Sequence, residues 1–235
     1  MVFPLYDDNP FRLPVPPIVT WGLIALNVLI FLVQISSGPE TAAGIVASFA
    51  ATPATLSGAE PAAGSVPAPL TLLTSMFLHG GWMHIIGNMV YLWVFGDDIE
   101  EALGRWRFLV FYLASGVLAA LAYTLFNPDG TTPMLGASGA ISGVLAAYLM
   151  LRPCAKVSVF VFRIVVRVRA YWVIGGWIML QLFSFLSQQA DDNVAYGAHF
   201  GGLVAGAVLF VLMRPCGVRL FERIQEVSQG EAGAS

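Results

Sequence analysis

Six long apolar segments follow one another along this sequence, and they constrain the fold more than any other feature. Of the 235 residues, 57% are hydrophobic and only 11% are charged, whereas a soluble domain has about 25% charged residues. A bilayer core about 30 Å thick needs about 20 apolar residues per helix. The candidate membrane-spanning segments are Ile18–Ile35, Met76–Phe95, Phe108–Phe126, Gly139–Leu151, Ala170–Leu186 and Val194–Met213.

These segments and their loops use nearly the whole chain, which predicts a single all-α membrane protein. We expect a compact six-helix bundle over residues 18–213, a cytoplasmic N-terminal segment over residues 1–17 and a cytoplasmic tail over residues 214–235. A cleaved signal peptide is the alternative for the first apolar segment. Residues 1–17 argue against it, because they carry one Arg, two Asp and five Pro in place of a basic leader.

The basic residues predict the orientation. All eleven Lys and Arg side chains precede the first segment, follow the sixth, or lie between the second and third or the fourth and fifth. The positive-inside rule makes that side cytoplasmic, so both termini are expected inside. Two cysteines, Cys154 and Cys216, lie just past cytoplasmic ends of segments, where thiols stay reduced.

Two connecting segments have distinctive compositions. The loop between the first two spans is rich in Ala, Pro, Gly and Ser. We assign no helix to it, although residues 45–51 suit the membrane interface. The segment "VSVFVFRIVVRVRA" between the fourth and fifth spans is apolar with spaced arginines, which predicts a segment lying at the headgroup boundary.

The polar residues inside the spans are the candidates for chemistry, since intramembrane ionisable groups are costly. Ser138 precedes Arg152 by fourteen residues, His199 precedes Arg214 by fifteen, and His84 precedes Asp97 by thirteen. At 1.5 Å per residue, the three side chains lie about 20 to 22 Å above the cytoplasmic anchors, in one layer. Asn88 lies one turn deeper than His84, on the same helix face.

The fourth span is too short to cross the bilayer, because thirteen residues give about 20 Å of helix. If it begins at Ser138, its N-terminus must open into a water-accessible cavity, where free backbone N–H groups favour an oxyanion. Glycines on the fourth and sixth spans, including Gly139 and Gly202, form small-residue faces that allow close helix packing. Ser138 and His199 are therefore expected to come within hydrogen-bonding distance.

Structural roles explain the remaining polar residues. Ser142 is expected to hydrogen-bond back to its own helix. Asn27 and Gln181 are expected to form hydrogen bonds between helices, and His79 is interpreted as a loop or interface histidine. The small residues in "GASG" and a single histidine within a span can also be explained by helix packing. The common depth of Ser138, His84 and His199 is the observation that favours a catalytic role.

The sequence resembles a known family at three motifs in the same order and spacing. These are "HGGWMHIIGNM" on the second span, "GASGAISG" on the fourth and "AHFGG" on the sixth, with "GDDIEEALGRWRF" after the second span. They resemble the signatures of rhomboid intramembrane serine proteases over residues 10–214. The loop between the first two spans lacks the Trp-Arg pair of many members, and Ser142 stands where some members have an aromatic residue below the catalytic histidine.

The resemblance implies a Ser–His dyad without an acidic third member. Ser138 matches the nucleophile and His199 the general base. His84, Asn88 and the Ser138 backbone N–H match the oxyanion donors, and Gly136 and Gly139 match the motif glycines. Family members are thought to admit substrate beside the fifth span.

We therefore expect an intramembrane serine endopeptidase in a prokaryotic inner (plasma) membrane. Its substrates would be single-pass membrane proteins, and the reaction needs no cofactor, metal or nucleic acid. A catalytically inactive client-binding relative is the alternative, although both dyad residues are present. A zinc enzyme is disfavoured because His79 and His84 lie about 140° apart around a helix, and a transporter because midplane charges are lacking. The oligomeric state stays open.

Overall fold

The structure, a computed structural model of the chain, describes residues 2–7, 16–60, 64, 66–161, 163–187 and 195–221. The predicted N-terminal segment and tail are thus described only at residues 2–7, 16–17 and 214–221. Six long or central helices build the bundle: α1 (Ile18–Ser36), α5 (Trp82–Leu103), α6 (Arg105–Phe126), α7 (Ser138–Leu151), α8 (Ala170–Ser187) and α9 (Tyr196–Met213).

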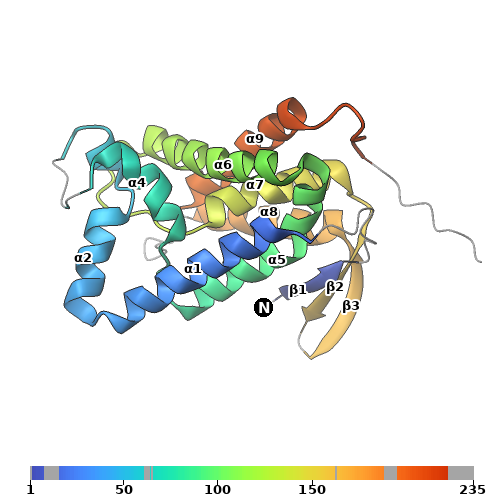
Figure 1. Cartoon of the computed structure of the whole chain (residues 1–235), viewed down its shortest axis with the longest axis horizontal. Helices are drawn as coiled ribbons and strands as arrows, with labels where there is room; N and C mark the ends of the chain where they lie inside the picture. The colour runs from blue at the N-terminus through green and yellow to red at the C-terminus, as the bar shows by residue number, and fades with distance from the viewer. Residues whose placement is uncertain are drawn as a thin grey trace, which may run out of the picture.

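Helix α7 is the centre of this bundle. It packs against α5, α6, α8 and α9, and Figure 1 shows it crossing between them. Nearly all of its residues are buried, from Gly139 to Tyr148 without a break. A helix that is apolar around its whole circumference belongs inside a fold, which explains why so short a segment holds the centre.

Each of the six predicted spans is helical, with shifted ends. The largest shift is at the second span, where residues 75–77 form a 3-10 helix (η1, Ser75–Phe77) and α5 begins only at Trp82. The first residue of the sixth predicted span, Val194, lies outside the described residues. Among the described residues, four helices are long and apolar enough to cross a membrane: α1, α6, α8 and α9. The shorter α7 is apolar, while α5 carries acidic residues at its C-terminal end.

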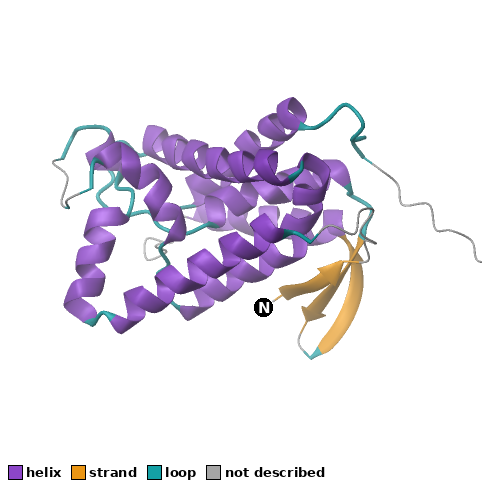
Figure 2. Cartoon of the chain, in the orientation of Figure 1, coloured by secondary structure: helices purple, strands orange, loops and turns teal. Residues whose placement is uncertain are grey.

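The prediction of an all-α fold is wrong in one region. Three antiparallel strands, β1 (Val2–Asp7), β2 (Lys156–Val161) and β3 (Ile164–Arg169), form a sheet in the order β1-β2-β3. Figure 2 shows it at one end of the helices. The segment predicted to lie at the headgroup boundary forms the β2–β3 hairpin, and its location at that boundary stays a prediction. Its β-branched residues and the Arg at every second position of "VVRVR" are typical of a strand with one exposed face.

Polar contacts join the C-terminal end of α7 to the sheet and to α5. The Tyr148 hydroxyl on α7 donates a hydrogen bond to the Asp7 carboxylate on β1. One turn later, Arg152 forms an ion pair with Asp98 of α5, and both side chains are buried. These contacts fix the C-terminal end of α7, opposite the end where Ser138 lies.

The loop after α1 also contains helices that the sequence analysis did not assign. These are α2 (Pro39–Phe49), α3 (Pro53–Leu56) and α4 (Ala68–Thr74), and each has Pro in its first turn, a position that favours helix initiation. Beyond α2, the backbone of Ala51 pairs with that of Met134 through two hydrogen bonds of 3.0 and 2.8 Å. The loop therefore holds the strand-like residues that lead into α7.

Glu100 of α5 anchors the N-terminus of α1. The backbone N–H groups of Val19 and Thr20 donate hydrogen bonds of 3.0 and 2.7 Å to its carboxylate, and the Thr20 hydroxyl donates a third of 2.8 Å. The first N–H groups of a helix have no partner within the helix. Glu100 therefore acts as an N-terminal cap supplied by another helix.

Replacing Glu100 with Ala should destabilise the bundle by about 2 to 3 kcal/mol. The change removes the carboxylate and leaves the hydrogen-bond donors of Val19 and Thr20 without a partner. Thermal unfolding in detergent measures this loss. Glu40→Ala, on the exposed first turn of α2, is the matched control and should be close to neutral. Equal melting temperatures for the two variants would contradict the capping role.

Candidate active site

Ser138 and His199 are in direct contact although 61 residues separate them in the sequence. Ser138 is the first residue of α7, and His199 lies in the first turn of α9. The distance from Ser138 Oγ to His199 Nε2 is 2.8 Å, a normal hydrogen bond for these groups. The contact expected from their common depth is therefore present.

Glycines bring the two helices close enough for this contact. A Cβ atom added at Gly202 of α9 would lie 2.1 Å from the Gly139 carbonyl oxygen of α7, and one added at Gly206 would lie 2.2 Å from the Gly143 Cα. Any side chain at these positions would therefore overlap the facing backbone. The small-residue faces predicted on the two spans do pack against each other, as such faces do in membrane bundles.

The side chains of His84 and Asn88 on α5 surround the backbone just before Ser138. A Cβ atom added at Gly136 would lie 2.7 Å from His84 Nε2 and 3.6 Å from Asn88 Nδ2. Gly136 also has a φ of +121°, in the region that favours glycine. Its backbone N–H is bonded to the Ser75 carbonyl at 2.9 Å, so the loop is held in this conformation.

The hydrogen bonds around His84 and Asn88 orient donors toward Gly136. The Gly80 N–H donates to His84 Nδ1 at 3.3 Å, which leaves the proton of the neutral ring on Nε2, the atom nearest Gly136. Asn88 Nδ2 lies 3.0 Å from His79 Nε2. An amide nitrogen carries two protons, so one donates to His79 and the other remains for a ligand beside Ser138.

His79 is more closely involved than the sequence analysis expected. It does lie in a loop, between η1 and α5, but it is only 3% exposed. Its backbone N–H donates to Gln34 Oε1 of α1 at 3.1 Å, and its ring stands edge-on to that of His84. The sequence feature that could have indicated this role is the position of His79 in the "HGGWMHIIGNM" motif, nine residues before its partner Asn88.

The other polar residues divide between local and site contacts. The Ser142 hydroxyl donates to the Ser138 carbonyl at 2.7 Å, which is the predicted bond to its own helix. Asn27 donates to the Leu23 carbonyl of α1. Gln181 is different, because its Oε1 lies 2.9 Å from His199 Nδ1. Gln181 therefore forms the predicted hydrogen bond between helices, and its partner is a residue of the site.

The residues of the site differ in their exposure to solvent. His199 and Asn88 are buried, at 7% and 8% exposure, while Ser138, Gly136 and His84 are partly exposed. Ser138 is therefore accessible from the surface of the structure, while its partner His199 is enclosed. Within the described part of the chain, no three His, Cys, Asp or Glu side chains lie together as a metal site would need.

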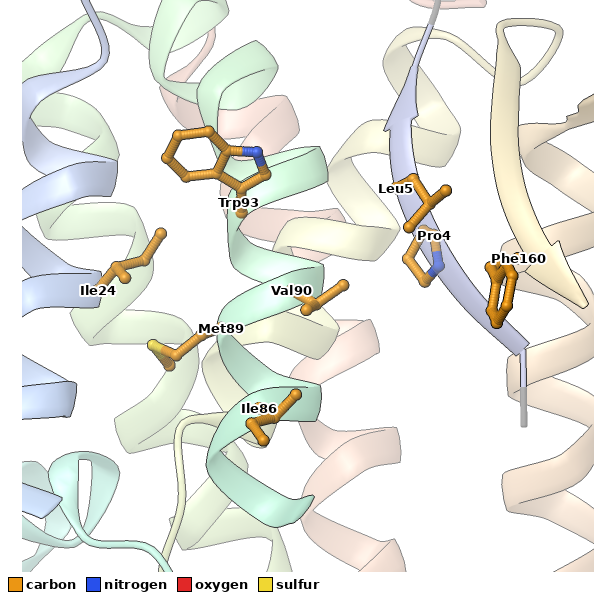
Figure 3. A pocket seen from close by; sticks show the side chains of 8 residues that line it. All are labelled: Pro4, Leu5, Ile24, Ile86, Met89, Val90, Trp93 and Phe160. Atoms are coloured by element: carbon orange, nitrogen blue, oxygen red, sulfur yellow. The ribbon is translucent and has the colours of Figure 1, made fainter. Parts of the chain in front are cut away.

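An apolar groove lies elsewhere on the molecule, between α1, α5 and the edge of the sheet (Figure 3). Its lining includes Met89 and Trp93 from α5 and Leu5 from β1. All lining side chains are apolar, and none belongs to the group around Ser138. The groove therefore contributes nothing to the chemistry of that site.

Comparison with known proteins gives one consistent family. The sequence model of the rhomboid domain matches residues 68–216. The chain is 32% identical over 191 residues to the rhomboid protease GluP of Bacillus subtilis, covering 81% of this chain and 34% of that protein. It is 30% identical over 157 residues to the mitochondrial rhomboid protein 1 of Saccharomyces cerevisiae, covering 61% of this chain and 41% of that protein.

A third relative, the putative rhomboid protease YdcA of Bacillus subtilis, is 28% identical over 141 residues, which are 60% of this chain and 65% of that protein. The chain thus spans between about a third and two thirds of the length of these relatives. The matched domain runs from α4 to the end of α9 and contains Ser138, His199, His84 and Asn88. This chain is an integral membrane protein that belongs to the rhomboid family.

Proposed function

We propose that the protein is an intramembrane serine endopeptidase that cleaves membrane-protein substrates in or near their transmembrane segment. The observation that carries the proposal is the 2.8 Å contact between Ser138 Oγ and His199 Nε2 at the N-terminus of α7. A serine paired with an imidazole beside unsatisfied N–H donors is the arrangement needed for acyl transfer. Relatives named rhomboid proteases support the same activity.

The first step forms an acyl-enzyme. His199 Nε2 removes the hydroxyl proton as Ser138 Oγ attacks the peptide carbonyl carbon. The resulting tetrahedral intermediate collapses, the C–N bond breaks, and the imidazolium gives its proton to the leaving amine. Water then attacks the ester by the same proton transfers in reverse order and releases the second product with Ser138 restored.

The oxyanion of each intermediate would lie beside Gly136. Asn88 Nδ2, His84 Nε2 and the Ser138 backbone N–H are the proposed donors. The N-terminal N–H groups of α7 have no partner inside the helix, and the helix dipole adds positive potential there. Donors fixed before the reaction stabilise a developing charge without reorganisation.

The membrane arrangement is part of the proposal. Residues 18–213 would form a six-span protease domain with both termini in the cytoplasm, as the distribution of Lys and Arg indicates. The active site would then open toward the non-cytoplasmic side of a prokaryotic inner membrane. Single-pass membrane proteins are the proposed substrates.

A fluorophosphonate probe tests the proposal. The serine oxygen attacks phosphorus and displaces fluoride, so a reactive serine becomes covalently labelled. We expect the purified protein to be labelled at a single residue, Ser138, identified by peptide mass spectrometry, and to cleave a reporter membrane protein in liposomes. Labelling at another serine refutes the assignment. No labelling and no cleavage favours the inactive client-binding alternative.

Replacing Asn88 with Ala should lower the rate of reporter cleavage by about 10- to 1000-fold, as the loss of one oxyanion donor does elsewhere. The effect should fall on kcat more than on KM, because the hydrogen bond from Asn88 to the oxyanion forms only in the transition state. Asn27→Ala in α1, which removes a buried amide that contacts neither Ser138 nor His199, is the control. An Asn88→Ala variant as active as this control would rule out the donor role.

A further inference from the structure

Gln181 occupies the side of His199 that faces away from Ser138. Its Oε1 lies 2.9 Å from His199 Nδ1, while His199 Nε2 lies 2.8 Å from Ser138 Oγ. The three side chains come from three helices, α8, α9 and α7. They form a chain of hydrogen bonds in which the imidazole is the middle member.

The chemistry of the amide fixes the proton positions in this chain. An amide oxygen only accepts hydrogen bonds, so the bond to Gln181 Oε1 requires the proton of the neutral ring to be on Nδ1. The lone pair is then on Nε2, which faces the serine hydroxyl. This is the only neutral tautomer in which His199 can remove the Ser138 proton, so Gln181 stabilises the reactive form of the base.

A second residue of α8 restricts the same ring. Trp177 lies one helical turn before Gln181, on the same face of α8, and its ring centroid is 5.6 Å from that of His199. The residue of α7 that could lie below the imidazole is Ser142, whose hydroxyl is already bonded to the Ser138 carbonyl. Tyr196 of α9 also stands edge-on to the imidazole, with 6.3 Å between the ring centroids. Contacts from α8 and from its own helix therefore orient the His199 ring.

Helix α8 itself is weakly attached to the bundle. Only Ala170, Val173 and Ile174, all near its N-terminal end, are buried. The part that carries Gln181 is largely exposed, with Leu180 at 60% and Phe183 at 69%. The hydrogen bond between Gln181 and His199 therefore ties this exposed part of α8 to α9.

We propose that Gln181 is a positioning residue for the base, an inference that rests on the function proposed above. It fixes the tautomer and the orientation of His199. Ser138, His199 and Gln181 then form a hydrogen-bonded triad, in which a neutral amide takes the place of the carboxylate of other serine proteases. Because the amide is neutral, it orients the ring without adding a negative charge to stabilise the imidazolium. The position of α8 then determines whether the base is aligned.

The test compares two replacements in the full chain in liposomes. Gln181→Met keeps the length of the side chain and removes the acceptor, whereas Gln181→Glu keeps an acceptor oxygen and adds a charge. Leu180→Ala, on the exposed face of the same helix, is the control. Rates of fluorophosphonate inactivation at saturating probe are measured from pH 5 to pH 9, together with the probe concentration for half-maximal rate.

Gln181→Met should slow the inactivation by about 10- to 100-fold, by analogy with the loss of groups that orient metal-binding histidines, with an unchanged half-maximal probe concentration. Gln181→Glu should retain most of the rate at high pH. Its low-pH limb should move to higher pH, because a carboxylate stabilises the imidazolium. The titratable groups facing His199 include His84 of α5, which interacts with it electrostatically, and Tyr196 of α9, whose ring contacts the imidazole. Both are unchanged in all variants.

The outcomes separate this inference from the proposed function. If Ser138→Ala is unlabelled while Gln181→Met matches Leu180→Ala in rate and pH profile, the positioning role is wrong and the protease assignment stands. A Gln181→Glu variant as slow as Gln181→Met, with no shift of the low-pH limb, also overturns it. Labelling of Ser138→Ala at the wild-type rate removes the proposed function and this inference with it.

Discussion

The Ser138→Ala variant is expected to lose fluorophosphonate labelling completely and to cleave a membrane reporter at the background rate. Loss of the nucleophile in other serine proteases costs about 10⁶-fold in kcat. The geometry offers no substitute, since the nearest hydroxyl along α7, that of Ser142, is fully buried and bonded to the Ser138 carbonyl. The fold should be retained, because removing a partly exposed hydroxyl leaves α7 packed.

Ser142→Ala is the matched control for this prediction. It removes the same hydroxyl group one turn further along the same helix, and labelling and cleavage should persist with only a modest loss. Melting temperatures of both variants report whether α7 remains in place. If Ser142→Ala loses activity while Ser138→Ala keeps it, the nucleophile has been assigned to the wrong serine.

Hydropathy and small residues were sufficient to predict the centre of the fold. The segments around α1, α6 and α9 are apolar over 18 or more residues, so burial in lipid leaves few alternatives to a helix. The facing glycines of α7 and α9 have no side chains that could keep the backbones apart. For these reasons the contact between Ser138 and His199 could be predicted from their common depth and the small residues around them.

The sheet and the roles of two polar residues required three-dimensional information. The β2–β3 hairpin alternates apolar and basic residues over a short segment, which suits an interfacial segment as well as a strand, and its partner β1 is more than 140 residues earlier. Gln181 and His79 act through partners on other elements, His199 and Asn88. Sequence spacing alone does not show which side chains of different helices meet.

The Gly202→Ala variant is expected to lose both stability and activity. The added Cβ would lie 2.1 Å from the Gly139 carbonyl oxygen and 3.1 Å from the Ser142 Cβ. The first contact is with backbone at the start of a buried helix, which cannot rotate away as a flexible side chain can. Overpacking of this kind costs about 3 kcal/mol, and the melting temperature in detergent should fall accordingly.

The loss of activity follows from the same displacement, because Gly139 is adjacent to Ser138 and Gly202 lies one turn after His199. A shift of about 1 Å between reacting groups can cost about 100-fold in rate. Fluorophosphonate inactivation, measured well below the lowered melting temperature, separates misalignment from unfolding. Gly22→Ala on α1, where an added Cβ meets nothing within 4 Å, is the control and should leave both properties intact. A Gly202→Ala protein with the stability and inactivation rate of this control would mean that α7 and α9 are not in backbone contact, and the Ser138–His199 distance would then lose its structural basis.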